Sequence, residues 1–201
     1  MPKSKEKCKE MRDSMRTRIL KESALYFARN GFRNTKISDL AGHIGIGQGT
    51  IYVYFKSKEE LYTAIMEQIN NENDIRELKL LSKLPCSGKM KIEKMIESVI
   101  SKLQEDEAYA VKVTLMTQFM MEESKYDSSN SLYQSDLYKC TAKIIKQGQG
   151  EGTVVSGDSI MLADMFWGVI YLYSLKKLFS KNYKMIDKVM LERILLVEGA
   201  G

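Results

Sequence analysis

A short stretch in the first third of the chain combines polar and aromatic side chains with small residues. The amide of Gln48 can form two hydrogen bonds with the edge of an adenine base. Thr50, Tyr52 and Tyr54 carry hydroxyl groups that can donate hydrogen bonds to phosphate oxygens. Lys58 adds a cation for the same partner. These residue types suit contact with a nucleic acid better than they suit the making or breaking of bonds.

Residues for catalysis or metal binding are sparse. His43 is the only histidine, and no second ligand or nucleophile lies near it in the sequence. Cys8, Cys86 and Cys140 are far apart and lack the spacing of a zinc site or a redox motif. The sequence also lacks a glycine-rich nucleotide-binding loop. We therefore expect no catalytic residue, no metal and no cofactor, and free thiols in a reducing compartment.

Helices must position the polar stretch. Apolar residues at helical spacing predict a first helix over residues 12–30, which Gly31 ends. Thr35 has an N-cap side chain and would begin a second helix, whose N-terminus could bind a phosphate. Gly45 would end that helix, and a short third helix would cover residues 47–55. Two short helices joined by a glycine turn are the usual frame of a helix-turn-helix, whose second helix enters the major groove.

The expected third helix has two distinct faces. With Ile51 pointing inward on a helical wheel, Phe55 lies within about 40° of it, whereas Gly49 and Val53 lie at about 160° and 200°. A small outward face allows the helix backbone to approach DNA closely. The residues that we expect to contact DNA are Thr35, Gln48, Gly49, Thr50, Tyr52, Val53, Tyr54 and Lys58.

The positive charge is concentrated at one end of the chain. Residues 1–60 contain 13 Lys or Arg and 7 Asp or Glu, a net charge of +6, whereas the remainder has a net charge of −1. This asymmetry indicates an N-terminal end that faces a polyanion. The first residues could form a solvated basic arm or touch phosphates and the minor groove, and the sequence leaves both interpretations open. The basic residues concerned are Lys3, Lys5, Lys7, Lys9, Arg12 and Arg16.

The rest of the chain also has a helical pattern. Ser57-Lys-Glu-Glu60 is a capping box that begins a fourth helix, and the pattern becomes polar near residue 72. We therefore expect an all-α fold, with a DNA-binding domain over residues 12–72 and a helical bundle over residues 73–201. The helices expected in the second domain cover about 88–104, 107–125, 129–147, 158–180 and 184–197.

The expected helix over 158–180 is apolar on nearly every side between Met165 and Tyr173. Such a helix must be buried on more than one side, so one side would face a pocket or core and another a partner subunit. Its apolar stretch is shorter than the roughly 20 residues that cross a bilayer. The N-terminus lacks the apolar segment of an export signal. We expect a cytoplasmic protein with no membrane contact.

Methionine and aromatic side chains are frequent on the same predicted helices. Methionine adapts to apolar ligands, but it is also ordinary core material, so each residue alone favours the core. Together they indicate an apolar pocket between helices 107–125, 129–147 and 158–180. The residues that could line it are Met116, Phe119, Met120, Met165, Trp167 and Tyr171.

The N-terminal helices resemble the TetR (tetracycline repressor-like) family of bacterial regulators over about 50 residues. The matching segments are Ala24–Phe27, Gly31-Phe32, Thr35–Ile37, Asp39–Ala41, Ile46–Phe55 and Ser57–Leu61. The C-terminal half is similar only in pattern, at Gln147-Gly148 and Asp164–Gly168. Two positions depart from the family pattern. Gln48 stands where lysine is frequent, and Gly47 stands where a serine N-cap is usual.

The resemblance implies a homodimer that binds a palindromic operator in double-stranded DNA with one recognition helix per subunit. It also implies a C-terminal domain for dimerisation and for an effector that changes the spacing of the two DNA-binding heads. We therefore expect a ligand-responsive repressor that a small, largely apolar molecule releases from DNA. The alternatives are an enzyme-like domain that processes its ligand, fused to a DNA-binding head, and a non-specific architectural DNA protein. The near-neutral second domain disfavours the architectural protein.

Overall fold

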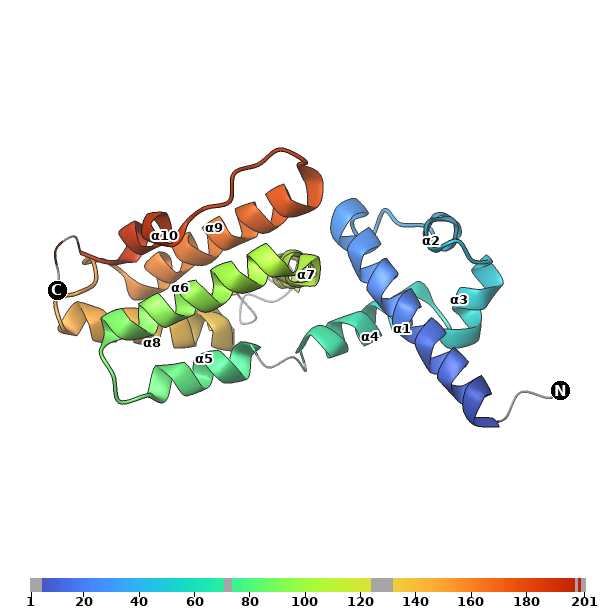
Figure 1. Ribbon diagram of the computed structural model, residues 1–201, viewed down its shortest axis with the longest axis horizontal. Coiled ribbons are helices and arrows are strands. Elements are labelled where there is room, and N and C mark those ends of the chain that lie inside the picture. Colours follow the sequence, from blue (N-terminus) through green and yellow to red (C-terminus); the bar gives the residue numbers. More distant parts are fainter. Residues whose placement is uncertain (1–4, 71–73, 124–131, 198, 200–201) are drawn as a thin grey trace. The chain divides into compact units, whose positions relative to one another are not determined.

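The computed structural model describes residues 5–70, 74–123, 132–197 and 199, and these are mainly helical (Figure 1). The chain divides into two compact units, Met1–Asn71 and Glu72–Gly201. Among the described residues, the only β-pairing is an isolated bridge between Val154 and Leu196. The predicted all-α fold is therefore confirmed.

The first unit contains α1 (Lys5–Asn30), α2 (Ile37–Ile44), α3 (Gln48–Tyr54) and α4 (Lys58–Asn70). Helix α1 begins seven residues before the predicted start at residue 12. Residues 5–11 lack an apolar stripe, which is why the pattern missed them, but Lys, Glu and Met are good helix formers. Gly31 ends α1 with a left-handed φ of 77°, and its N–H bonds to Phe27 O at 2.8 Å.

Apolar side chains from all four helices form the core of this unit. Helix α1 packs against α2 and α4, and α2 packs against α3. Full burial of each large side chain stabilises the fold by about 1.5–3 kcal/mol. The buried apolar residues are Ile19, Leu20, Phe27, Ala28, Ile37, Leu40, Ala41, Ile44, Ile51, Phe55, Leu61, Ile65, Met66 and Ile69.

The second unit contains seven helical elements in the described residues. They are α5 (Asp74–Lys83), α6 (Gly88–Glu105), α7 (Glu107–Glu123), the short 3-10 helix η2 (Leu132–Gln134), α8 (Asp136–Gly150), α9 (Ser159–Phe179) and α10 (Lys188–Leu195). Helix α5 was not predicted, although its Ile75, Leu78 and Leu81 recur every three residues. Helix α10 starts after residue 184 because Asp187 caps it by accepting the Met190 N–H at 2.8 Å.

The predicted helix over 129–147 is wrong at both ends. The start falls partly outside the described residues, and α8 itself begins at Asp136 after the N-cap Ser135. It continues through Gly148 to Gly150, three residues beyond the predicted end at residue 147. A Cβ on Gly88 of α6 would lie 2.4 Å from the Gly148 nitrogen, and a Cβ on Gly148 would lie 2.3 Å from Val154 Cγ2. These glycines therefore allow two helices to pack closely rather than end one of them.

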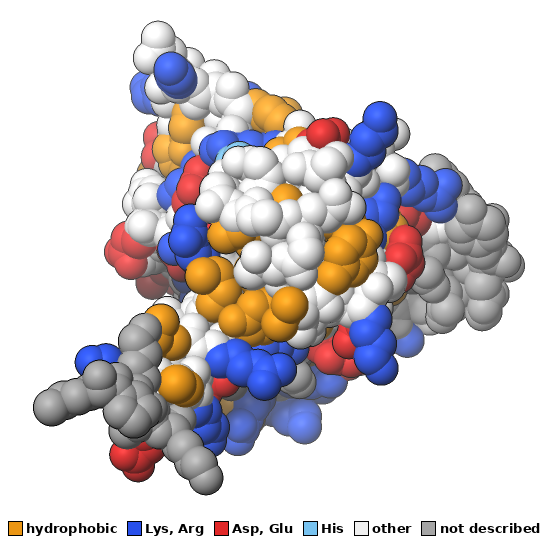
Figure 2. Space-filling view, turned by 90° about the vertical axis from the view of Figure 1, so that its right-hand side faces the viewer, with side chains coloured by type: hydrophobic (Ala, Val, Ile, Leu, Met, Phe, Trp, Pro, Cys, Tyr) orange, Lys and Arg blue, Asp and Glu red, His pale blue; other side chains and the backbone are white. Residues whose placement is uncertain are grey.

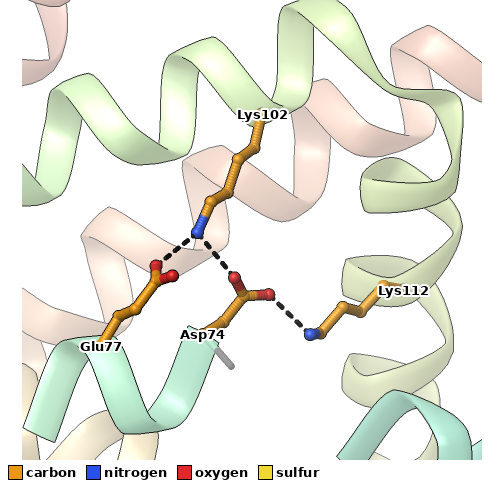
Figure 3. Close-up of polar contacts among 4 residues, drawn as sticks. All are labelled: Asp74, Glu77, Lys102 and Lys112. Atoms are coloured by element: carbon orange, nitrogen blue, oxygen red, sulfur yellow. Dashed lines mark hydrogen bonds and ion pairs between the residues drawn. The ribbon is translucent and has the colours of Figure 1, made fainter. Parts of the chain in front are cut away.

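A cluster of charged side chains fixes the start of α5 to α6 and α7 (Figure 3). Lys102 Nζ lies 2.7 Å from Asp74 Oδ1 and 2.7 Å from Glu77 Oε2, and Lys112 Nζ lies 2.6 Å from Asp74 Oδ2. Burial alone would raise the pKa of Asp74. The hydrogen bonds and the positive charges of the two lysines outweigh that effect and lower the pKa.

Candidate DNA-binding interface

A left-handed glycine joins α2 to α3. Gly45 has a φ of 74°, and its N–H caps α2 by bonding to carbonyl oxygens of the last turn. A residue with a side chain rarely adopts this conformation, which explains why glycine stands at the turn. Helix α1 supports the same turn, since Arg18 Nη2 donates to Ile44 O at 2.6 Å.

Helix α3 is held by its inner face and exposes the opposite one. Ile51 is fully buried and Phe55 is 2% exposed, whereas Val53 is 67% exposed. Gln48 and Gly49 are also exposed, and a Cβ added to Gly49 would have no atom of the protein within 4 Å. The orientation predicted from the helical wheel is therefore the orientation in the structure.

Hydroxyl groups flank this outward face. Tyr52 is exposed, whereas Thr50 and Tyr54 are half-buried. Figure 2 looks onto the side of the first unit that carries α3, and it shows uncharged side chains in the middle of the face. Lys and Arg side chains, with some acidic ones among them, lie around its margin. This arrangement suits a surface that reads base edges at its centre and contacts phosphates at its edge.

Thr35 does not have the predicted role. Its side chain is only 4% exposed, and its hydroxyl donates to Gly31 O at 2.8 Å. Its backbone N–H donates to Phe32 O at 3.2 Å, so both donors are used within the loop after α1. The N-cap of α2 is Lys36, which makes no side-chain capping bond. Thr35 therefore stabilises the loop and is not available to DNA.

Lys58 is also committed inside the protein. Its ammonium donates to Phe32 O at 3.0 Å, to Arg33 O at 3.4 Å and to Thr35 O at 3.0 Å. The same group lies 4.5 Å from the centroid of the Phe32 ring. An ammonium has three donors, so Lys58 joins the start of α4 to the loop before α2 and is not a phosphate contact.

The sequence-based list missed Lys36. Its side chain is exposed at the N-terminus of α2, where the first N–H groups of a helix lack partners within the helix. The signal was present as a lysine directly before the first buried residue of the helix, but the N-cap had been assigned one residue too early. Lys36 therefore joins the residues that could face a phosphate.

Comparison with known proteins agrees with this geometry. A family model described as "Bacterial regulatory proteins, tetR family" matches residues 19–65, which run from α1 into α4. Residues 19–65 therefore carry the DNA-binding module of the TetR family.

Two relatives that match most of this chain are named as regulators. The chain is 28% identical to the HTH-type transcriptional regulator YerO of Bacillus subtilis over 165 residues, which cover 78% of this chain and 53% of YerO. The chain thus spans about half the length of that relative. It is 24% identical to the fatty acid metabolism regulator protein of Bacillus subtilis over 161 residues, covering 76% of this chain and 77% of that protein.

A solved structure supports the fold of this chain over nearly its whole length. The ketosteroid transcriptional regulator KstR2 of Mycobacterium tuberculosis matches with a TM-score of 0.65 at 15% identity, covering 92% of this chain and 96% of that one. The helix-turn-helix unit and the helical second unit are therefore arranged along the chain as in a known regulator.

The candidate pocket residues lie on α7 and α9, which pack against each other. Met165 is a correction, because it is 57% exposed and points away from the interior of its unit. Trp167 is anchored inward, since its indole N–H donates to Thr141 Oγ1 at 3.0 Å. The five half-buried candidates are Met116, Phe119, Met120, Trp167 and Tyr171.

Within the described part of this chain, no group of three or more His, Cys, Asp or Glu side chains is placed to hold a metal ion. The described helices also include none that is long and apolar enough to span a membrane. His43 is exposed, with its ring 5.0 Å from that of Tyr26 and its Nε2 3.8 Å from Glu22 Oε2.

Proposed function

We propose that the protein is a sequence-specific DNA-binding transcriptional regulator, with α3 as its recognition helix. The observation that carries this proposal is the outward face of α3, where exposed Gln48, Gly49 and Val53 form a shallow surface. Gln48 reads a base edge, and the two small residues allow the backbone to approach the floor of the groove. The names of the curated relatives support regulation of transcription rather than an enzymatic role.

Phosphate contacts then surround this reading surface. The hydroxyl groups of Thr50, Tyr52 and Tyr54 donate to phosphates beside the groove. Lys36 and the uncapped N–H groups at the start of α2 contact another phosphate, because a helix N-terminus carries partial positive charge. The division of roles follows position, since the residues near the middle of the face specify sequence and those at its edge position the helix.

We also propose a homodimer that forms through α9. Its buried side carries Ala163, Phe166 and Ile170, which pack into the core of the second unit. On the other side, large apolar residues stay exposed at heptad-like spacing, as in helices that pair with another helix. These residues, with their exposed fractions, are Met161 (52%), Met165 (57%), Leu172 (47%) and Phe179 (58%). A two-fold interface of this kind presents two recognition helices to a palindrome.

The effector in this proposal is a small, largely apolar molecule that binds between α7, α8 and α9 and releases the protein from its operator. Half-buried Met116, Phe119 and Tyr171 supply adaptable apolar contacts. Thr114 of α7 is fully buried, and its hydroxyl has no hydrogen-bond partner among the described residues, so it could bond to one polar group of the ligand. The similarity to a fatty acid metabolism regulator supports an apolar effector.

Selection of bound fragments from random duplex DNA tests the proposal. We expect the selected fragments to share a palindrome, and affinity for it should fall steeply with salt because phosphate contacts release counterions. Gln48→Ala should relax the preference at one base pair by about 1–3 kcal/mol. Tyr54→Phe should weaken binding to all sequences by a similar factor. An absence of any enriched sequence would overturn the proposal, and equal loss of discrimination in both variants would overturn the division of roles.

A further inference from the structure

Only the C-terminal half of α1 belongs to the core of the first unit. The helix has 26 residues, but Ile19 is the first that is buried. From residue 6 to residue 18, every side chain except half-buried Met15 is exposed. At 1.5 Å per residue this segment is about 20 Å long. Its apolar side chains Met11 and Met15 lie on one side of the helix, and neither is fully buried.

The charges on this exposed segment are sorted by face. Lys9, Arg12 and Arg16 lie within about 60° of one another on a helical wheel. Glu6, Glu10 and Asp13 are centred about 90° away, on the neighbouring face. The segment therefore presents a basic stripe, defined as Lys9, Arg12 and Arg16, rather than an even mixture of charges.

The basic stripe begins beside the recognition helix. The guanidinium of Arg16 lies 5.1 Å from the centroid of the Phe55 ring, and Phe55 is the C-cap residue that follows α3. From Arg16 to Lys9 the stripe runs about 10 Å farther along α1. The N-terminal end of α1 lies on the same side of the first unit as α3 (Figure 1). The stripe thus continues the proposed DNA-binding face beyond the helix-turn-helix itself.

We propose that the basic stripe of α1 is a second contact surface for duplex DNA and binds the phosphate backbone next to the groove that α3 enters. The proposal rests on the proposed function, because it adds to the same complex. A duplex carries one negative charge per about 1.7 Å of its axis, so a stripe of this length faces several phosphates. Two arginines suit this partner, since a guanidinium can hold two phosphate oxygens at once. The sequence had left a solvated arm and a DNA contact open, and the position of Arg16 beside α3 favours the DNA contact.

The test compares the full-length protein with Lys9→Gln/Arg12→Gln, which leaves Arg16 and its packing on Phe55 in place. Both substituted side chains are exposed, so the thermal unfolding temperature should not change. Affinity for a duplex that carries the selected palindrome is measured over a series of salt concentrations. We expect at least a roughly tenfold loss at 0.1 M salt and a slope of log affinity against log salt that is smaller by about 3.6, the value for two lost phosphate contacts in each subunit of the proposed dimer.

Lys181→Gln/Lys184→Gln is the matched control, because it removes the same charge from exposed positions of the second unit. It should bind as the wild type does. Glu6→Gln/Glu10→Gln should strengthen binding severalfold, since it removes negative charge beside the stripe. If the wild type binds the palindrome and the stripe variant shows the same affinity and slope, the stripe is a solvated arm and this inference fails alone. If the wild type selects no sequence, the proposed function fails first.

Discussion

The outward faces of α3 and α9 are both exposed, but they differ in chemistry. Helix α3 shows an amide, hydroxyl groups, a glycine and a single valine, with cations around the margin of the face (Figure 2). Helix α9 shows methionine, leucine and phenylalanine at positions 161, 165, 172 and 179. The first face can exchange its hydrogen bonds with water for bonds to DNA at small net cost. The second face gains free energy only when it leaves water.

This difference in chemistry indicates a different kind of binding partner for each face. A polar, shallow face on a short helix suits a polyanion with a patterned groove. An apolar stripe of about five turns suits another apolar helix, and a second copy of the same chain provides one. Charge introduced on α9 should therefore disrupt binding of a second copy of the chain. A larger side chain on α3 should disrupt binding of DNA.

The largest effect is expected from charge on α9. Met165→Glu/Leu172→Glu should dissociate the dimer, because paired carboxylates would lose hydration in the interface. We expect the dimer dissociation constant to rise at least about a hundredfold, or about 2.8 kcal/mol. Analytical ultracentrifugation measures the change, and circular dichroism should show an intact helical fold, since both side chains are exposed within the unit.

Leu80→Glu/Leu84→Glu is the matched control for this prediction. These leucines are also exposed, at 58% and 43%; Leu80 lies in α5, and Leu84 follows directly after the helix ends at Lys83. The control should remain dimeric. If the α9 variant stays dimeric and the α5 variant dissociates, the dimer interface does not lie on α9 and the prediction is wrong.

A smaller effect is expected from one methyl group on α3. Gly49→Ala should stabilise the free protein by about 0.5–1 kcal/mol, because alanine favours a helix and the added Cβ meets no protein atom within 4 Å. The same methyl group should weaken DNA binding about tenfold to a hundredfold if the backbone approaches the bases closely. Urea unfolding should therefore show a higher free energy of unfolding, whereas DNA-binding isotherms should show a lower affinity.

Gly150→Ala provides the matched control, since this glycine of α8 also has open space around its added Cβ. It should gain stability in the same direction and bind DNA as the wild type does. If Gly49→Ala bound DNA with unchanged affinity, the backbone of α3 would not approach the groove floor closely. The proposal that the small residues of α3 allow such an approach would then be wrong.

The first unit was largely predictable because its signals are local. Gly31 and Gly45 end helices by their left-handed conformation, and the apolar spacing around Ile51 sets the orientation of α3. Thr35 and Lys58 were assigned to DNA wrongly, because the partners of both lie in the loop after α1. A side chain that bonds across 23 or more residues leaves no local pattern in the sequence.

The second unit was less predictable because its decisive contacts are distant. Gly148 lies within α8 because it packs against Val154 and because α6 passes close by at Gly88, which no local pattern could reveal. The two faces of α9 were also indistinguishable, since both are apolar. Only the packing of Phe166 and Ile170 into the core shows that Met165 lies on the outer side.

The smallest effect is expected at the charged cluster of α5, which contributes to neither face. Asp74→Asn should lower the free energy of unfolding of the second unit by about 1 kcal/mol at neutral pH, because Lys102 and Lys112 lose an ionised partner. The pKa of Asp74 is lowered in the folded protein, so the carboxylate stabilises the fold above its ordinary value of 3.8. That contribution is lost as the pH falls below this value through the lowered pKa.

The unfolding free energies of the wild type and Asp74→Asn should therefore converge in acid, as measured by urea unfolding at a series of pH values. Glu77→Gln is a suitable comparison, because this carboxylate bonds to the same Lys102 but its side chain is 57% exposed, which should make its effect smaller. DNA affinity and dimerisation should be unchanged in both variants. If either variant lost DNA binding at unchanged stability, the charged cluster would be energetically coupled to the first unit. Charged groups outside the two faces would then also influence DNA binding.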